Sequence, residues 1–376
     1  MELKAENFLK VLKMSEKIKA RKLDHLTISL TKKVESNKPP GFNDVTLIHN
    51  ALPEINKNEI DLSINLFGCR LNAPLIIEPM TGGTFKAIKI NASLAEAAEK
   101  LKIGIGVGSQ RAALEDPSLK KTYTIVREKA STTLVLANIG CSQILGEEGI
   151  EKAKEAVEMI NANALTIHLN SLQESIQPEG ETKFKGVLNA ISQVIKKLNV
   201  PVIIKETGAG ISMEVAKKLE NIGVKFVDIA GLGGTSWASV EYYRAKANSN
   251  KILEALGKTF WDWGIPTVAS LIEVKSSTKI KVIASGGIRT GLDAAKSIAL
   301  GAEAVGLALP LLKHAIKGVK QTMQFLKIII EELKTAMFLT GSKNLIELKN
   351  VPVVISGETA IWLFERGINL NNFYKA

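Results

Sequence analysis

The chain has 376 residues and carries 49 Lys and Arg against 38 Asp and Glu, which gives a formal net charge of +11. Hydrophobic residues make up 45% and charged residues 23%, a composition that excludes an intrinsically disordered chain, and no apolar run is long enough to predict a transmembrane helix. The lysines are spread over helix-like segments without a nucleic-acid-binding motif, so the charge predicts a solvated surface and neither a nucleic-acid partner nor membrane insertion.

The first 70 residues precede any regular pattern of elements. The stretch "SNKPPGFNDVTLIHNALPEI" indicates loop and irregular strand. The N-terminal "MELKAENFLKVLKMSEKIK" lacks the apolar run and cleavage site of a secretory signal. It could contact a membrane, pack on a partner subunit or be a dispensable extension. Cys69 and Cys141 have neither metal-ligand nor redox-motif spacing, and we therefore expect a cytoplasmic protein.

From about Leu71 onward, short β-branched runs alternate with longer amphipathic ones. The predicted strands cover residues 74–79, 103–108, 133–138, 164–170, 200–206, 224–231, 280–287 and 302–309. Eight strand–helix alternations with short connections predict a parallel α/β structure that closes as a (β/α)₈ TIM barrel. An open doubly wound sheet is the alternative.

The barrel prediction divides the chain into three parts of one domain. Residues 1–70 form an N-terminal extension, 71–310 the barrel and 311–376 additional C-terminal helices, of which the first is one long helix over 311–341. Between the sixth and seventh strands, residues 235–266 form a connection far longer than the others. A connection of that length predicts a lid or a binding loop.

Polar or glycine-rich segments follow all eight predicted strands. In a TIM barrel these C-terminal strand ends carry the active site. Arg111, His168, Lys205 and Arg289 all lie at such ends. Glycines alone would only make turns, but this set of charged and polar groups is more than a structural barrel needs.

Two of these ends predict particular chemistry. "SGGIRTG" (285–291) opens a helix, so its N–H groups could hold a phosphate with help from Arg289. Lys205 is the only charge inside "PVIIK", and an inward lysine there must face an anion or form a Schiff base. The electron-rich edge of a reduced flavin is one such anion. "GIGVGSQ" lacks the spacing of a dinucleotide fingerprint.

The stretch "LTIHLNSLQE" raises a further question. Its strand pattern directs Thr166, His168 and Asn170 to one face, and Gln173 and Glu174 follow at once. Buried polar groups cost free energy unless they find partners. Either the fold or a ligand must satisfy them.

Eight motifs occur in an order that resembles a known family. "RKLDHL", "MTGG", "GSQR", "HLNSLQE", "KETGAG", "GLGGTSWASVE", "FWDWGIPT" and "SGGIRTG" together closely resemble the FMN-dependent, type 2 isopentenyl diphosphate isomerases. The resemblance implies interconversion of isopentenyl and dimethylallyl diphosphate in isoprenoid biosynthesis, with reduced FMN and Mg²⁺ and without net redox change. NADPH or another reductant would reduce the flavin, and a homo-oligomer, a tetramer or octamer, would be expected.

The resemblance also implies roles for individual residues. FMN contacts would come from Pro79, Met80, Thr81, Ser109, Asn138, Lys205, Thr235, Gly287, Ile288, Arg289, Ala308 and Leu309. Substrate contacts would come from Arg21, Lys22, His25, Ser109, Gln110, Arg111, His168, Asn170 and Gln173. The catalytic set would be Gln173, Lys205, His168, Glu241 and Trp237. Glu174 would hold Mg²⁺ together with phosphate oxygens and water.

Two positions depart from the family pattern. Ala230 stands where serine is common, and Glu78 with Pro79 precedes "MTGG" where small residues are usual, so FMN affinity could differ. Two other functions compete with the isomerase. One is an FMN-dependent oxidoreductase acting on another small anionic substrate, although the His-Gly-x-Arg-Gln run of hydroxy-acid oxidases is absent from the sequence. The other is a non-catalytic phospholigand-binding barrel.

Overall fold

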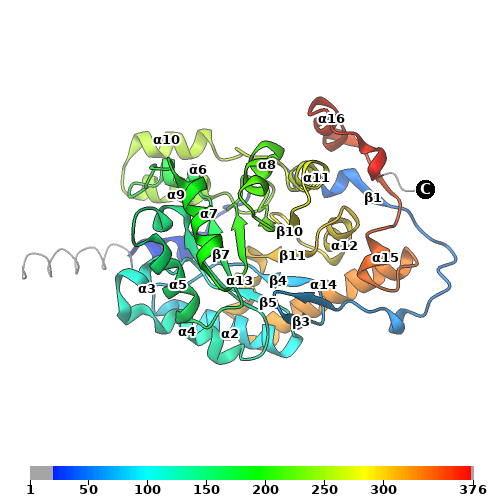
Figure 1. The fold of residues 1–376 in the computed structure, drawn as a ribbon, viewed down its shortest axis with the longest axis horizontal. Coiled ribbons are helices and arrows are strands. Elements are labelled where there is room, and N and C mark those ends of the chain that lie inside the picture. Colours follow the sequence, from blue (N-terminus) through cyan, green and yellow to red (C-terminus); the bar gives the residue numbers. More distant parts are fainter. Residues whose placement is uncertain (1–19, 374–376) are drawn as a thin grey trace, which may run out of the picture.

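The barrel is the centre of the computed structural model, which describes residues 20–373. Eight parallel strands close in the order β10-β11-β4-β5-β6-β7-β8-β9, with helices around them (Figure 1). The strands are β4 Leu75–Ile77, β5 Gly104–Gly106, β6 Val135–Gly140, β7 Ala164–His168, β8 Val202–Lys205, β9 Phe226–Asp228, β10 Lys281–Ser285 and β11 Ala304–Leu307. Each of the eight predicted strands is present, and the TIM barrel is confirmed in place of an open sheet.

The apolar character of these strands follows from their burial on both faces. All six residues of β6 are buried, as are all residues of β4, β5, β7 up to Ile167, β8 and β11. A parallel strand between an outer helix layer and the barrel interior needs apolar residues on both sides. That is why these segments read as continuous runs and not as alternating ones.

Amphipathic helices cover the barrel on the outside. The main covering helices are α2 Lys86–Leu101, α4 Lys121–Lys129, α5 Gly149–Met159, α7 Val187–Lys197, α8 Met213–Asn221, α11 Thr267–Ser277 and α12 Gly291–Ala299. The long connection between the sixth and seventh barrel strands adds two helices, α9 Trp237–Ala247 and α10 Lys251–Thr259. Both pack beside the short helix α6 Ser171–Ile176, so this connection is an ordered helical pair over one side of the barrel mouth.

The N-terminal segment reaches both ends of the barrel. The chain is helical over 20–31 at the rim, and the hairpin of β2 Ile64–Leu66 and β3 Cys69–Leu71 lies at the opposite end. There Phe67 packs edge-on against Phe226 with ring centroids 4.6 Å apart, which closes the apolar interior. Residues 1–19, including the stretch with the open membrane or subunit interpretations, lie outside the described residues.

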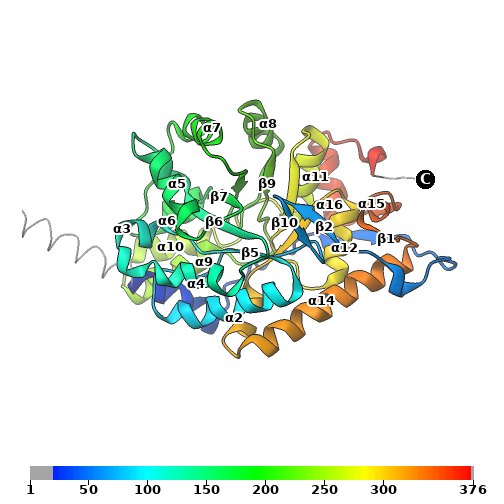
Figure 2. The same cartoon turned by 60° about the horizontal axis from the view of Figure 1, so that its bottom comes forward.

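The C-terminal segment departs from prediction at one point. The predicted single helix over 311–341 is two helices, α13 Leu309–Ala315 and α14 Val319–Leu339. Gly318 between them has φ 108° and ψ 178°, a conformation that favours glycine and cannot continue a helix. The break lets α14 run along the outside of α12 and α2 (Figure 2).

A small sheet joins the two ends of the chain. β1 Val45–Leu47 pairs antiparallel with β12 Val353–Ile355, and α15 Leu345–Leu348 and α16 Gly357–Glu365 flank the latter. Asp44 adds a side-chain bond by accepting from the Thr359 hydroxyl at 2.7 Å. Across residues 20–373, none of the helices combines the length and apolarity needed to cross a membrane.

Candidate active site

A cavity opens at the C-terminal ends of the barrel strands. Every barrel strand contributes to its wall through a residue near its C-terminal end, either within the strand or just beyond it: Pro79, Ser109, Asn138, His168, Lys205, Ala230, Ser285 and Gly306. The helix over 20–31 and the start of α9 complete the wall on one side. One enclosed space therefore gathers residues that are far apart in the sequence.

The residues predicted to contact FMN all lie on this wall. They are Pro79, Met80, Thr81, Ser109, Asn138, Lys205, Thr235, Gly287, Ile288, Arg289, Ala308 and Leu309. Arg289 currently donates to Glu35 and to the carbonyl of Ile288 at 2.9 Å. Its guanidinium is thus held at the mouth by Glu35, an acceptor from the N-terminal segment.

The predicted phosphate motif is only partly available. The N–H groups of Arg289 and Thr290 donate to Asp293 Oδ2 at 3.0 Å each, and that of Gly291 donates to Glu332 Oε2 at 2.6 Å. The first turn of α12 is therefore occupied by carboxylates, contrary to the expectation that it would face a phosphate. The glycine loop before it, with Gly287 on the cavity wall, remains the part of the motif that can receive one.

Replacing Gly287 with alanine should weaken FMN binding by about tenfold or more, because the loop would have to move. Gly287 has φ +74°, and an added Cβ would lie 2.7 Å from the carbonyl oxygen of Gly233 and 2.8 Å from Cβ of Pro40. Fluorescence titration with FMN measures the change. The control is Gly223→Ala, which has φ +94° but open space around its Cβ. Equal FMN affinity in both variants would contradict the prediction.

Lys205 lies in a buried ionic cluster. Its Nζ is 2.6 Å from Asp228 Oδ2, 2.9 Å from Glu78 Oε2 and 3.3 Å from the hydroxyl of Ser285. Burial would lower the pKa of Lys205, but Asp228 and Glu78 together raise it above its ordinary value. The amine is therefore an ammonium at neutral pH, which disfavours the Schiff-base alternative because that chemistry needs a free amine.

A second group of positive charges lines the rim. Arg21 and Lys22 come from the helix over 20–31, and Arg111 begins α3 Arg111–Glu115. Burial, with Arg21 and Arg111 nearby, lowers the pKa of Lys22 to about 7. Glu115 and Glu181 form ion pairs with Arg111 at 2.7 and 3.0 Å. The charge repulsion of Lys22 by Arg21 and Arg111 still lowers the Lys22 pKa. A multiply charged anion between these cations would relieve it.

Glu174 points into the cavity from α6. Its carboxylate accepts from the Asn170 amide at 2.8 Å, from the Gln177 amide at 3.4 Å and from the N–H of Glu181 at 2.6 Å. Within residues 20–373, no three His, Cys, Asp or Glu side chains gather as a metal cage. A lone carboxylate with neighbouring amide oxygens fits Mg²⁺, which is usually held by one or two carboxylates, phosphates and water.

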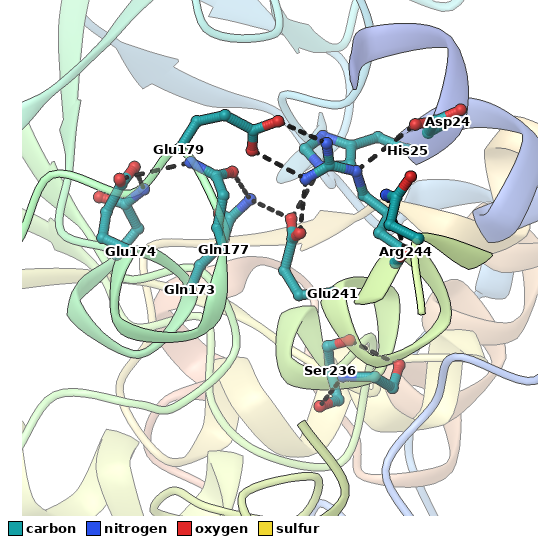
Figure 3. A network of polar contacts seen from close by, with 12 residues as sticks. Asp24, His25, Gln173, Glu174, Gln177, Glu179, Ser236, Glu241 and Arg244 are labelled. Carbon is teal, nitrogen blue, oxygen red and sulfur yellow. Dashed lines mark hydrogen bonds and ion pairs between the residues drawn. The ribbon is translucent and has the colours of Figure 1, made fainter. Parts of the chain in front are cut away.

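A hydrogen-bonded network crosses from α6 to α9 above the cavity (Figure 3). Glu241 contacts His25 Nε2 at 2.8 Å, Arg244 Nη1 at 2.7 Å and the Gln173 amide at 3.5 Å. Arg244 extends the network to Glu179 at 2.9 Å. Although burial alone would raise it, His25 and then Arg244 hold the pKa of Glu241 below its usual value. Glu241 is thus a buried anion.

Glu241 does not reach the cavity wall, whereas its partners His25 and Gln173 do. The predicted catalytic residue Trp237 also lines the cavity and packs edge-on against His25, with centroids 5.1 Å apart. Any influence of Glu241 on a bound molecule therefore passes through His25 or Gln173.

His168 shows how the polar end of strand β7 is satisfied. Its Nδ1 lies 2.9 Å from the amide oxygen of Asn138, and its pKa is lowered to about 3 by burial, Lys22 and Lys205. The ring is therefore neutral at pH 7. The fold thus satisfies one ring nitrogen of His168, while His168 and Asn170 also face the cavity, where a ligand can bind them.

Gln110 differs from its predicted role. Its amide donates to the carbonyl of Ala156 at 2.8 Å, and its oxygen accepts from the N–H of Asn138 at 2.9 Å. The side chain is fully buried between β6 and α5, so it supports the strand end and does not contact the cavity. Its neighbours in "GSQR", Ser109 and Arg111, do line it.

Several wall residues were not predicted. They include Glu78, Gln143, Gln177 and Ser285. Glu78 differed visibly from the family pattern, but only the closed barrel shows that it faces Lys205. Trp261 donates to the carbonyl of Glu35 at 3.1 Å and anchors a loop instead of lining the cavity.

Comparison with known proteins gives two kinds of match. The FMN-dependent dehydrogenase family matches residues 152–354. The isopentenyl-diphosphate delta-isomerase of Methanothermobacter thermautotrophicus is 50% identical over 356 residues, covering 95% of this chain and 99% of that protein. The protein of the same name from Methanosarcina mazei is 49% identical over 355 residues, covering 94% and 96%.

Solved structures share the fold at low identity. A mandelate oxidase variant with an FMN adduct has a TM-score of 0.60 at 18% identity, covering 86% of this chain and 94% of that one. The lactate oxidase of Pediococcus acidilactici has a TM-score of 0.64 at 16% identity, covering 93% and 94%. At these identities the likeness concerns the barrel alone.

Proposed function

This chain belongs to the isopentenyl-diphosphate delta-isomerase family, and we propose that it converts isopentenyl diphosphate into dimethylallyl diphosphate with FMN and Mg²⁺ bound in the barrel mouth. One observation carries the proposal. A single cavity joins the cationic rim of Arg21, Lys22 and Arg111 to the buried Lys205 cluster. An anionic head and an electron-rich cofactor can therefore be held in the same space.

The chain's residues fit the two proposed occupants. The depressed pKa of Lys22 supports a diphosphate at the rim, where His168 and Asn170 supply neutral polar contacts. The glycine loop at Gly287 and the apolar groups of Met80 and Ala308 suit the phosphate and ring of FMN. Reduced FMN would supply negative charge and a proton-exchanging nitrogen beside the alkene.

Moving a double bond requires protonation at one carbon and deprotonation at another. Gln173 and Trp237 line the same cavity as the rim cations and Lys205, and the hydrocarbon would lie against them. The His25–Glu241 pair next to them can pass a proton: burial lowers the pKa of His25 although Glu241 opposes that shift, so the imidazole at the cavity wall is a neutral acceptor. A bound flavin and substrate that fill the cavity would exclude water from a cation-like transition state.

Three further parts of the proposal concern conditions. Glu174 would share Mg²⁺ with the diphosphate, and NADPH or another reductant would keep the flavin reduced. Two free cysteines, Cys69 and Cys141, support a reducing compartment such as the cytoplasm. A homo-oligomer, as a tetramer or octamer, stays a prediction from the resemblance.

An anaerobic omission assay tests this function. Purified protein with FMN, dithionite or NADPH, Mg²⁺ and isopentenyl diphosphate should form dimethylallyl diphosphate, and turnover should vanish when either reductant or Mg²⁺ is left out. Bound flavin that reduces normally without product formation would contradict the isomerase and favour an oxidoreductase of another anionic substrate. Failure to bind FMN at all would favour a simple phospholigand-binding barrel.

A further inference from the structure

The ionic cluster at Lys205 contains one cation and two carboxyl groups. Glu78, Asp228 and Lys205 are exposed by only 4%, 3% and 7%. Glu78 follows β4, whereas Asp228 ends β9 and Lys205 ends β8, so the cluster spans the barrel interior. Two ionised carboxyls beside one ammonium would leave an uncompensated negative charge in a buried place, which is costly.

The two carboxyl groups are not equivalent. Asp228 is closer to Lys205 and also accepts from the Ser285 hydroxyl and from the N–H of Ala230 at 3.3 Å. Glu78 is 2.9 Å from Lys205. Among the described residues, neither of its carboxyl oxygens accepts a hydrogen bond from a hydroxyl or a backbone N–H. The negative charge is therefore best held on Asp228, and Glu78 is the group that takes a proton.

The barrel has a space for this side chain. Gly306 lies on the neighbouring strand β11, and a Cβ there would be 1.8 Å from Glu78 Oε1. The missing side chain at 306 thus admits the carboxyl of Glu78, which lines the cavity together with Lys205. Glu78 therefore fits into the cavity wall beside Lys205 because position 306 has no side chain.

We propose that Glu78 is a proton-carrying third member of the Lys205 cluster, which sets how much positive charge Lys205 offers to reduced FMN. This rests on the proposed function, in which the cavity holds FMN. With Glu78 protonated, Lys205 and Asp228 balance and the cluster is neutral. With Glu78 ionised the cluster carries one negative charge, which repels an anionic reduced flavin.

The electrostatics give the pH range and its sign. Burial and Asp228 raise the pKa of Glu78 to about 8 against the opposing effect of Lys205. The other titratable groups that sense Lys205 are His168, which is neutral at pH 7, and Glu206, whose pKa burial raises to about 7 against the N–H groups that it accepts. Both groups are kept in every Glu78 variant, so their titration is common to all the profiles. Glu78 is protonated below about pH 8 and ionised above it. Preference for the reduced flavin should therefore fall as pH rises through that value.

The experiment compares wild type with Glu78→Gln, which keeps the size of the side chain and cannot ionise. The dissociation constants of oxidised FMN and of dithionite-reduced FMN are measured anaerobically from pH 6 to 9.5, and their ratio is the preference for reduced flavin. Above pH 8 the wild-type ratio should fall relative to that of Glu78→Gln, by up to about tenfold for each pH unit.

Glu78→Ala is the second variant, because it also lacks the carboxyl but leaves a smaller side chain. It should share the pH profile of Glu78→Gln even if its absolute affinity differs. Parallel profiles for wild type and both variants would overturn the role of Glu78 and leave the FMN site standing. A wild type that binds no FMN would overturn the proposed function as well.

A flavin-free measurement gives an independent readout. Because Glu206 also carries a proton up to about pH 7, infrared spectra of the unliganded wild type and Glu78→Gln are subtracted at each pH, and the difference should show a protonated-carboxyl band of Glu78 that persists to about pH 8. Loss of that band near the ordinary pKa of glutamate would overturn the inference without reference to the cofactor.

Discussion

Replacing Lys205 with methionine should leave a protein that purifies without FMN and whose turnover, with FMN added, is lower by about a hundredfold or more. The substitution removes the only positive charge within ion-pair distance of Glu78 and Asp228 among the described residues. The flavin would lose its counter-charge, and so would the buried carboxylate of Asp228. Flavin content from the visible spectrum and kcat at saturating FMN measure the first effect.

The same variant should also be less stable, by roughly 3–5 kcal/mol, since one partner of a buried ionic cluster is gone. Urea unfolding measures this loss. Adding Asp228→Asn should restore part of the stability but not the flavin retention, which separates the two effects. The matched control is Lys275→Met, a half-buried lysine outside the cavity, which should keep FMN. A yellow and fully active Lys205→Met protein would contradict the assignment.

Replacing Glu174 with glutamine should remove the response to Mg²⁺ and lower turnover by about a hundredfold, while FMN stays bound. Glutamine has the same shape and can still accept from Asn170, so α6 should keep its position. Only the negative charge that would attract the metal is lost. The measurement is turnover against Mg²⁺ concentration, with flavin content recorded for the same sample.

The control for this experiment is Glu181→Gln, which removes a half-exposed rim carboxylate that pairs with Arg111. It changes the charge near the diphosphate region but keeps the backbone N–H that donates to Glu174, and its Mg²⁺ titration should keep the wild-type midpoint. A Glu174→Gln protein with an unchanged midpoint would rule out the metal role of this residue.

The barrel was predictable because its signal is local. A strand buried on both faces must be an apolar run, and the chain repeats such a run eight times between amphipathic segments. The break at Gly318 was missed because the apolar pattern continues across it, and only the glycine's conformation interrupts the helix. Helical periodicity alone carries no information on such a break.

The site was predictable residue by residue but not in its pairings. Among the residues that strand ends and family motifs predicted, two lie off the wall: Gln110 turns outward to α5, and Glu241 lies behind His25 and Gln173. The neighbours of Lys205 come from β4, β9 and β10, and no local pattern links them. The same holds for Glu332 at the start of α12, which lies 41 residues beyond its partner Gly291.

The pairing of β1 with β12 has a consequence for how the protein is made on the ribosome. The helix that carries Arg21, Lys22 and His25 is synthesised early, but its partner Glu241 lies 216 residues away. The strand β1, which follows this helix, can pair with its partner β12 only after Val353–Ile355 has left the exit tunnel. The helix with the rim cations can therefore dock on α9 well before the β1–β12 sheet forms. A chain cut before Val353 would contain every residue of the cavity wall yet lack the sheet that anchors Val45–Leu47.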